Sequence, residues 1–389
     1  MSAIARPVRL YCRRLVIALL AATAAACGGN APLPPVPAAD DAVAERQKDA
    51  FVEAMRPRRE GRPVVAILAL NDATETTDLL LPHAVLERAG VADVLVVAPH
   101  AGAIHLFPTL QVQAELDFAA FERLHPNGAD YVIVPAMEPD DNPDVSAWLR
   151  RQADRGARVI GVCIGAVVVA NAELLDDRRF LSHWYARAGI AAKRPGATFV
   201  PHQRYLADRG VATTTGISAS VPMTIALVEA IGGTEKARML AAELGVTAWT
   251  PAHDSSRFGL TARRRWDYIA DTLAFWRRKP RAIEVRNGTD DIALALTADA
   301  WVRSRMARVE AQSATPTVRL RSGLVLSASA PAPDVARIPL ETGLKPMQQL
   351  EHTLCLIAEQ HGANRRDRVE QELEYTAAPG LCGKPEAQG

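Results

Sequence analysis

A regular alternation of short apolar runs and helical segments most constrains the fold of this chain. Residues 64–70 are all apolar and are bounded by Pro63 and Asn71. Continuous runs of this length are typical of strands that are buried on both faces of a parallel sheet. Strands that alternate with helices predict βαβ units, with helices on both faces of the sheet. The expected strands cover residues 64–70, 93–98, 130–135 and 158–162, and the expected helices cover residues 78–89, 143–155 and 165–175.

Length and composition limit the number of domains and the class of protein. A chain of 389 residues predicts two or three domains, and 49% hydrophobic with 23% charged residues excludes a wholly disordered protein. The net charge is only +1, so no general basic surface exists to bind nucleic acid by counterion release. The sequence contains no HExxH motif, no paired CxxC motif and no phosphate-binding glycine loop. We therefore expect no nucleic-acid partner, no metal and no cofactor.

The first 27 residues have the pattern of an export signal. Four arginines and no acid lie in residues 1–14, and the uncharged run 15–26 follows. Twelve helical residues reach about 18 Å, which is too short to span a membrane core of about 30 Å. The run ends in Ala24-Ala25-Ala26-Cys27, which resembles the end of a bacterial lipoprotein signal with Cys27 as the lipidated residue. The alternative is an ordinary cleaved signal with an incidental cysteine.

The segment after Cys27 suits a tether. Residues 28–40 hold four prolines and two glycines, so they predict a semi-extended spacer, and residues 42–55 predict a short helix. Together, residues 28–60 form a linker. We expect an exported protein on the periplasmic side of a bacterial membrane, anchored through a lipid. The outer membrane is favoured, because no acid follows the cysteine in Gly28-Gly29.

Cys163 is the strongest candidate for a reactive residue. In parallel sheets, chemistry gathers at the carboxyl ends of the strands. Cys163 lies there, between an apolar strand and a helix, and Gly161 and Gly165 flank it. This arrangement predicts a nucleophile elbow, and the start of the following helix favours the thiolate. The alternative is a small buried cysteine with a packing role.

The motifs around Cys163 closely resemble the DJ-1/PfpI family. The nearest branch is the class I glutamine amidotransferase-like domain of some transcription regulators and of isonitrile hydratases. This resemblance implies a flavodoxin-like three-layer sandwich with a mostly parallel sheet over residues 61–246. The segments that carry the resemblance are residues 71–82, 161–166, 172–178, 182–184, 213–220 and 226–229.

The same resemblance implies roles for individual residues. Cys163 would be the nucleophile, Asp78 its acid–base partner or thiolate stabiliser, and His183 a general base or orienting group. Each has a plain alternative: Asp78 can simply begin a helix, and His183 can be a packed histidine. Four further side chains are expected to line the site: Glu75, Glu138, Ile164 and Trp184.

Three departures from the family pattern bear on activity. Ala136-Met137 replaces a Gly-Gly pair whose N–H groups help to bind an oxyanion in relatives, which puts that oxyanion site in doubt. Ile164 replaces the threonine of isonitrile hydratases and disfavours that reaction. Thr224 stands where an aspartate is usual.

Residues 247–389 predict a smaller C-terminal α+β extension. Expected strands at 282–286 and 292–297 are joined by Asn287-Gly288, a strong hairpin signal. Residues 318–329 predict a strand pair around Gly323, and residues 348–362 predict a helix. We find no internal repeat in the sequence. Cys355 and Cys382 leave two alternatives open, a disulfide or two separate thiols.

These observations favour an exported, cysteine-dependent hydrolase, hydratase or lyase that acts on a small electrophile. Two alternatives remain. The first is a non-catalytic ligand-binding or sensing module of the same fold. The second is an amidotransferase-like transcription regulator, which requires that the export signal is a misassigned start. A small molecule is the expected partner, and a homodimer is expected by analogy with relatives.

Overall fold

The computed structural model describes residues 33–36, 40–259, 261, 266, 268, 270–271, 274–378 and 380–382. The export signal expected at residues 1–27 and the expected lipidation site Cys27 lie outside these residues. Met1–Pro35 and Val36–Gly389 are two separate units, and the elements described below belong to the second. Within the described ranges, no helix is both long and apolar enough to cross a membrane.

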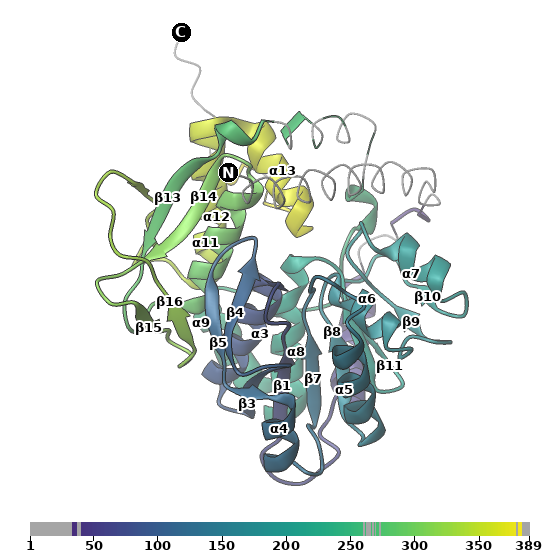
Figure 1. Cartoon of the computed structure of the whole chain (residues 1–389). Coiled ribbons are helices and arrows are strands. Elements are labelled where there is room, and N and C mark those ends of the chain that lie inside the picture. Colours follow the sequence, from purple (N-terminus) through teal and green to yellow (C-terminus); the bar gives the residue numbers. More distant parts are fainter. Residues whose placement is uncertain are drawn as a thin grey trace, which may run out of the picture. The chain divides into compact units, whose positions relative to one another are not determined.

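A seven-stranded sheet is the centre of the fold, in the order β11-β12-β8-β7-β1-β3-β6 (Figure 1). Neighbouring strands run parallel except for β11 and β12, which are antiparallel. The strands are β1 (Val64–Leu68), β3 (Asp93–Ala98), β6 (Leu116–Asp117), β7 (Tyr131–Val134), β8 (Arg158–Gly161), β11 (Tyr205–Asp208) and β12 (Val211–Thr214).

Helices cover both faces of this sheet, which confirms the expected three-layer α/β sandwich. Along β1, Val65 and Ile67 pack into one apolar core, while Ala66 and Leu68 pack into the other. This explains the unbroken apolar run, because a strand buried on both faces needs no polar side. The first core includes α2 (Asp41–Ala54), α3 (Thr76–Ala89), α8 (Ser220–Gly232) and α9 (Thr234–Leu244). The second includes α4 (Phe118–Leu124), α5 (Pro143–Asp154), α6 (Gly165–Asn171) and α7 (Arg187–Lys193).

Smaller elements connect these layers. A five-stranded sheet has the order β15-β16-β5-β4-β2, and β9 pairs with β10. The elements are β2 (Thr74–Glu75), β4 (Gly102–Phe107), β5 (Gln111–Ala114), β9 (Arg179–Phe180), β10 (Thr198–Phe199), β15 (Thr317–Arg319), β16 (Val325–Ser327) and the short 3₁₀ helices η2 (Ile217–Ala219), η3 (Ser255–Arg257) and η4 (Phe275–Arg277).

The C-terminal region contains a parallel three-stranded sheet in the order β14-β13-β17. Its strands are β13 (Lys279–Glu284), β14 (Ala307–Gln312) and β17 (Ala336–Arg337), and its helices are α11 (Asp291–Arg303), α12 (Pro346–His361) and α13 (Ala363–Leu373). The expected strand pair around Gly323 is confirmed as β15 and β16, and the expected helix at 348–362 is confirmed as α12.

The strand expected at 292–297 is wrong, because these residues lie in α11. The Asp290 side chain accepts hydrogen bonds from the N–H groups of Ile292 and Ala293, so the segment after Asn287-Gly288 starts a capped helix instead of the second strand of a hairpin. Most of α11 is buried. A helix that is buried all round has no polar face, so its period of 3.6 residues is hidden in the sequence.

Cys355 and Cys382 form a disulfide, which resolves the open alternative in favour of a bond. The bond joins α12 to the segment that follows α13. The path of the chain after Leu373 is therefore tied back to the C-terminal region, and this segment contacts the elbow loops through Glu374.

Candidate functional site

Cys163 lies in the sharp turn between β8 and α6. Its φ is 57°, a left-handed value that is strained for a residue other than glycine. Two hydrogen bonds hold the turn: the Cys163 N–H donates to Thr214 Oγ1 at 3.0 Å, and Ser182 Oγ donates to the Cys163 carbonyl at 3.1 Å. The backbone therefore has the strained geometry that the sequence predicts for an elbow.

The glycine after the elbow is required by close packing. A Cβ added to Gly165 would overlap the carbonyl oxygen of Val134 in β7. Gly161 is tight as well, since its Cβ would meet the Ala166 backbone at 3.0 Å. These two glycines let α6 approach the sheet closely and so set where Cys163 stands.

Two buried carboxyl groups from the start of α3 lie near the thiol. Glu75 caps the helix by accepting the Asp78 N–H at 2.7 Å. Asp78 Oδ2 accepts the Ala136 N–H at 3.1 Å, while Asp78 Oδ1 is buried with no hydrogen-bond partner. The Ala136 N–H, which was considered above as an oxyanion donor, thus donates to Asp78 instead. Burial raises the pKa of Asp78 well above its usual range, and the charge of Glu75 adds to this.

The end of α13 lies against the loops beside Cys163. Glu374 accepts hydrogen bonds from the Trp184 N–H at 2.5 Å and from the Gly216 N–H at 3.1 Å, and His253 Nε2 lies 3.4 Å from Glu374 Oε2. Burial opposes ionisation of Glu374, but the interactions with His253 and His183 prevail and lower its pKa. Glu374 is therefore an ionised, hydrogen-bonded anchor for this segment.

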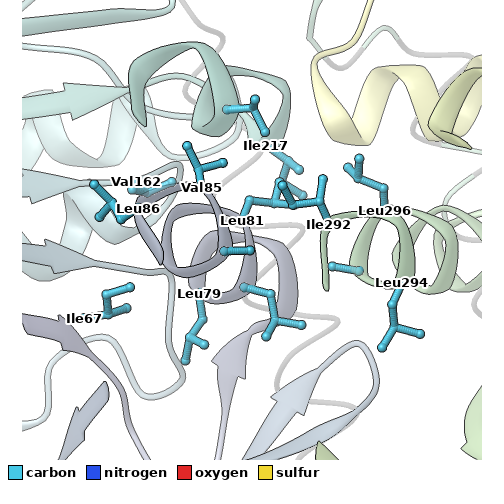
Figure 2. Close-up of a cluster of buried hydrophobic side chains, with 14 of the residues drawn as sticks. Ile67, Leu79, Leu81, Val85, Leu86, Val162, Ile217, Ile292, Leu294 and Leu296 are labelled. Atoms are coloured by element: carbon cyan, nitrogen blue, oxygen red, sulfur yellow. The ribbon is translucent and has the colours of Figure 1, made fainter. Parts of the chain in front are cut away.

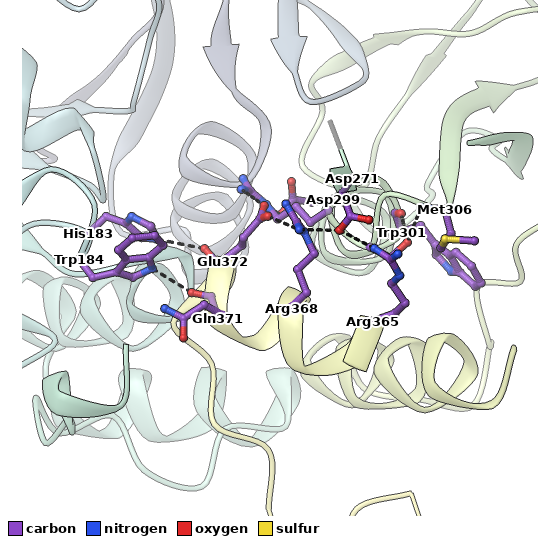
Figure 3. A network of polar contacts seen from close by, with 12 residues as sticks. His183, Trp184, Asp271, Asp299, Trp301, Met306, Arg365, Arg368, Gln371 and Glu372 are labelled. Atoms are coloured by element: carbon purple, nitrogen blue, oxygen red, sulfur yellow. Dashed lines mark hydrogen bonds and ion pairs between the residues drawn. The ribbon is translucent and has the colours of Figure 1, made fainter. Parts of the chain in front are cut away.

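Arg303, at the end of α11, joins the two parts of the chain. Its guanidinium contacts three carboxylates, those of Glu75 at 2.8 Å, Asp299 at 2.7 Å and Glu372 at 3.4 Å. Figure 3 shows how the network continues along α13, where Arg368 lies between Glu372 and Asp271. Arg368 also pairs with Glu372, so Glu75 and Asp299 share the charge of Arg303. Burial therefore favours the uptake of a proton by one of these two acids.

The electrostatic environment disfavours the thiolate of Cys163. Only 4% of the residue is exposed, and this burial raises its pKa well above the usual value. The charges of Asp78, Glu75 and Glu374 raise the pKa further, while Arg303 opposes them. Burial and the neighbouring carboxylates therefore oppose the thiolate that the start of α6 is expected to favour.

The other candidate residues differ in their placement. His183 is buried, and both ring nitrogens are engaged: Nδ1 accepts the Tyr185 N–H, and Nε2 donates to the Glu372 carbonyl. Trp184 Nε1 donates to the Gln371 carbonyl (Figure 3). Ile164 is half-buried next to Cys163, and Glu138 is exposed to solvent. The structure therefore brings His183 and Trp184 against α13, while Glu138 stays at the surface.

Three residues of the network around the site were missed from the sequence: Arg303, Glu372 and Glu374. They lie more than 130 positions after Cys163, in the part of the chain whose helices are only partly predicted. No local motif marks them, because their role depends on long-range packing. The described residues include no cluster of three or more His, Cys, Asp or Glu side chains suited to a metal ion.

The acid excess around Arg303 predicts a pH-dependent stability. Burial raises the pKa of Asp299 to about 7, against opposition from Arg303. A pKa raised by folding stabilises the protein below the unfolded value of about 3.9, and this stability is lost as the pH rises through the folded value. Asp299→Asn imitates the protonated group, so its stability relative to the wild type should rise by about 2–4 kcal/mol between pH 4 and pH 7.

Urea unfolding at a series of pH values measures this difference. Asp49→Asn, at an exposed position on α2, is the control and should show a flat difference. A flat difference for Asp299→Asn as well would contradict the acid excess.

Comparison with known proteins identifies part of the chain. Residues 64–230 match the model of the DJ-1/PfpI family. The HTH-type transcriptional regulator GlxA of Rhizobium meliloti is 38% identical over 104 residues, which cover 26% of this chain and 32% of the relative. The HTH-type transcriptional regulator CdhR of Pseudomonas aeruginosa is 27% identical over 133 residues, which cover 34% and 39%. The matches thus span about a third of each curated relative's length.

Solved structures show a partial likeness. DJ-1beta of Drosophila melanogaster has a TM-score of 0.44 at 18% identity, covering 48% of this chain and 100% of that chain. A ThiJ/PfpI family protein of Pseudomonas syringae has a TM-score of 0.47 at 19% identity, covering 56% and 89%.

Proposed function

Because residues 64–230 form a DJ-1/PfpI family domain, we propose that this chain is a cysteine-based binding or sensing module for a small electrophilic molecule. One observation carries the proposal. Cys163 keeps the strained elbow geometry, yet it is buried among acids that hold its thiol protonated. A thiol in this state is protected until the C-terminal segment moves, which suits detection better than continuous turnover.

Three features of the structure, in which the C-terminal segment covers the elbow, weigh against continuous catalysis. A nucleophilic cysteine needs its thiolate, whereas Asp78, Glu75 and Glu374 all raise the pKa of Cys163. An oxyanion site needs free N–H donors, and the Ala136 N–H donates to Asp78. Both nitrogens of His183 are also engaged, so it has no free lone pair to accept the thiol proton.

A second candidate is the cysteine-dependent hydrolase, hydratase or lyase. Asp78 favours it, because Asp78 Oδ1 is buried without a hydrogen-bond partner and burial raises the pKa of Asp78, which makes its carboxylate a stronger proton acceptor than usual. In such a reaction the Cys163 S–H bond would break as the sulfur bonds to an electrophilic carbon. Asp78 would take the thiol proton and pass it to the atom that gains the electron pair. The C-terminal segment would have to open first.

We also propose that the protein is exported and held on the periplasmic side of a membrane, the outer membrane being favoured, through a lipid on Cys27. The signal pattern of residues 1–27 supports this. The Cys355–Cys382 disulfide supports it independently, since such bonds persist in oxidising compartments. Its partners would be a small molecule and the membrane, and we expect no nucleic acid. The regulatory function named for both curated relatives is not transferred, because each match spans about a third of that relative.

The pH dependence of Cys163 alkylation tests the proposed function. In a protein that starts after Cys27, we expect the apparent pKa of Cys163 to lie above the reference of about 8.5. Asp78→Asn removes the largest neighbouring charge that raises this pKa, so the midpoint should move down by about one unit or more. Alkylation measured by peptide mass spectrometry gives both midpoints.

Asp72→Asn, at an exposed position in the same loop, is the matched control and should leave the midpoint unchanged. A wild-type midpoint below 8, together with turnover of an electrophile, would reject the sensing role in favour of the enzyme. A raised midpoint with stoichiometric trapping and no turnover supports the proposal.

A further inference from the structure

The C-terminal region repeats the order of elements of the first half of the family domain. Apart from the two-residue strand β2, the series β1, α3, β3, β4, β5 has the same types and order as β13, α11, β14, β15, β16. In both series the first and second strands pair in parallel, and the third and fourth pair antiparallel. A further parallel strand joins the other side of the first one, β7 beside β1 and β17 beside β13.

The helices that follow are repeated too. α8 and α9 are joined by Gly233 with φ 87° and ψ 163°, and α12 and α13 are joined by Gly362 with φ 88° and ψ 157°. At equivalent positions before these glycines, Thr224 and Thr353 each donate a hydroxyl hydrogen bond to the carbonyl four residues earlier. α8 packs on α3, and α12 packs on α11.

Ion pairs cross between the two series in a reciprocal way. The same interval of 215 positions separates Glu75 from Asp290 and Arg88 from Arg303. Glu75 and Asp290 each cap their helix, and Arg88 and Arg303 each lie in its last turn. Arg303 contacts Glu75 at 2.8 Å, and Arg88 contacts Asp290 at 2.8 Å. The cap of the first series thus contacts the arginine of the second, and the cap of the second contacts the arginine of the first. Reciprocal contacts of this kind are expected across a two-fold axis.

The apolar core between the two helices holds residues at the same interval. In Figure 2, Leu81 of α3 lies beside Ile292 of α11, and Leu79 and Leu81 belong to the same core as Leu294 and Leu296, the residues 215 positions later. At the sheet, Val112 of β5 pairs with Leu326 of β16 in antiparallel register. These two strands hold the same place in the two series, so they meet as equivalent strands do at a two-fold axis.

We infer that residues 279–374 are a shortened second copy of the fold of residues 64–244, docked on the first copy across an internal two-fold axis. The chain thus carries its own partner on the face formed by α3. The second copy is reduced: residues 338–345, all of them described, hold neither strand nor helix where the first copy has β8 and α6. It therefore lacks an elbow, and Ala293 stands at the position equivalent to Asp78.

The second copy places two charged side chains beside the site of the first, Glu374 on the elbow loops and Arg303 on Glu75. The charge of Arg303 lowers the pKa of Cys163, whereas its symmetry mate Arg88 contacts Asp290 of the second copy, which has no elbow. Arg303 is therefore a positioning residue, supplied by the second copy to the single site of the first. This role does not depend on the proposed function, because Arg303 acts on the thiol whatever the chemistry of the site.

Arg303→Met and Arg88→Met form a matched pair that tests the inference. Both arginines make the reciprocal ion pair, but Arg303 also holds Asp299 and Glu372, so Arg303→Met should lower the melting temperature more than Arg88→Met. Only Arg303→Met should raise the alkylation midpoint of Cys163, by about one unit. Arg303→Lys keeps the positive charge and should retain the wild-type midpoint. It therefore distinguishes an effect of the charge from an effect of lost stability. Equal midpoint shifts in both methionine variants, or none in either, would overturn the inference.

Hydrogen exchange of the chain starting after Cys27 tests the internal docking separately. We expect α3 and α11 to be as protected as β1, at every protein concentration, because their partner belongs to the same chain. Protection of these two helices that grows with concentration would show that a second chain supplies the contact, and would refute the internal partner.

Discussion

Glu374→Ala should expose Cys163 and strongly destabilise the protein. The substitution leaves the buried N–H groups of Trp184 and Gly216 without an acceptor. Each unpaired buried donor costs about 1–3 kcal/mol, so we expect a loss of about 3–5 kcal/mol in the free energy of unfolding. At pH values below the midpoint, the alkylation rate of Cys163 should rise at least about tenfold. The reason is that a decrease of about 1.4 kcal/mol in the free energy of local opening raises the population of the open segment tenfold.

Denaturant unfolding and timed alkylation, read by peptide mass spectrometry, measure the two effects. Glu370→Ala is the matched control one turn earlier on α13. Glu370 is half-buried and pairs with Arg366, so its loss should cost no more than about 1 kcal/mol and leave the alkylation rate unchanged. An unchanged alkylation rate in a destabilised Glu374→Ala would mean that this segment does not guard the thiol.

A second large effect is expected at the elbow itself. Gly165→Ala places a Cβ on the Val134 carbonyl and against the Pro135 backbone, so α6 or β7 must move. Overpacking of this kind lowers the free energy of unfolding by about 1–3 kcal/mol. We expect a loss near the upper end, because the added Cβ meets backbone atoms, which cannot rotate away as a side chain can. Gly189→Ala in α7 meets nothing within 4 Å and should be neutral or stabilising by up to about 1 kcal/mol. Thermal unfolding of the two variants measures this difference. Equal melting temperatures for Gly165→Ala and Gly189→Ala would contradict the close packing at Gly165.

The family domain could be predicted from the sequence because its signals are local. The apolar run at β1, the glycine after α3 and the glycines around Cys163 each report the conformation of their own neighbourhood. Gly90, for example, ends α3 with a φ of 60°, as its position predicts. Local signals of this kind hold whatever the rest of the chain does.

The environment of the thiol could not be predicted in the same way. The expected thiolate rests on the start of α6, which lies next to Cys163 in the sequence. The pKa of Cys163 is instead set by burial and by groups such as Arg303 and Glu374, which packing brings from 140 or more positions away. The wrong prediction for α11 has the same origin. Its buried Ala and Leu residues reflect the contact with α3, which no local pattern reveals.

The repeat is hidden in the sequence for a related reason. Two copies of a fold can share their caps and crossing ion pairs while almost every other residue differs. The positions that keep the same chemistry are few, such as Arg88 and Arg303 across the axis and Thr224 and Thr353 within their helices. The structure reveals these pairs because it shows which atoms meet.

Burial of Cys163 also decides how the chain oxidises. Cys12 and Cys27 lie in residues 1–27, so the remainder holds Cys163, Cys355 and Cys382. While the chain is unfolded, any two of these thiols can pair, and exchange proceeds only where a thiol is accessible. Once the first copy folds and its elbow is covered, Cys163 is withdrawn and the native bond is the one that remains. In the folded chain the fold therefore withholds Cys163 from exchange and leaves Cys355 and Cys382 as the bonded pair.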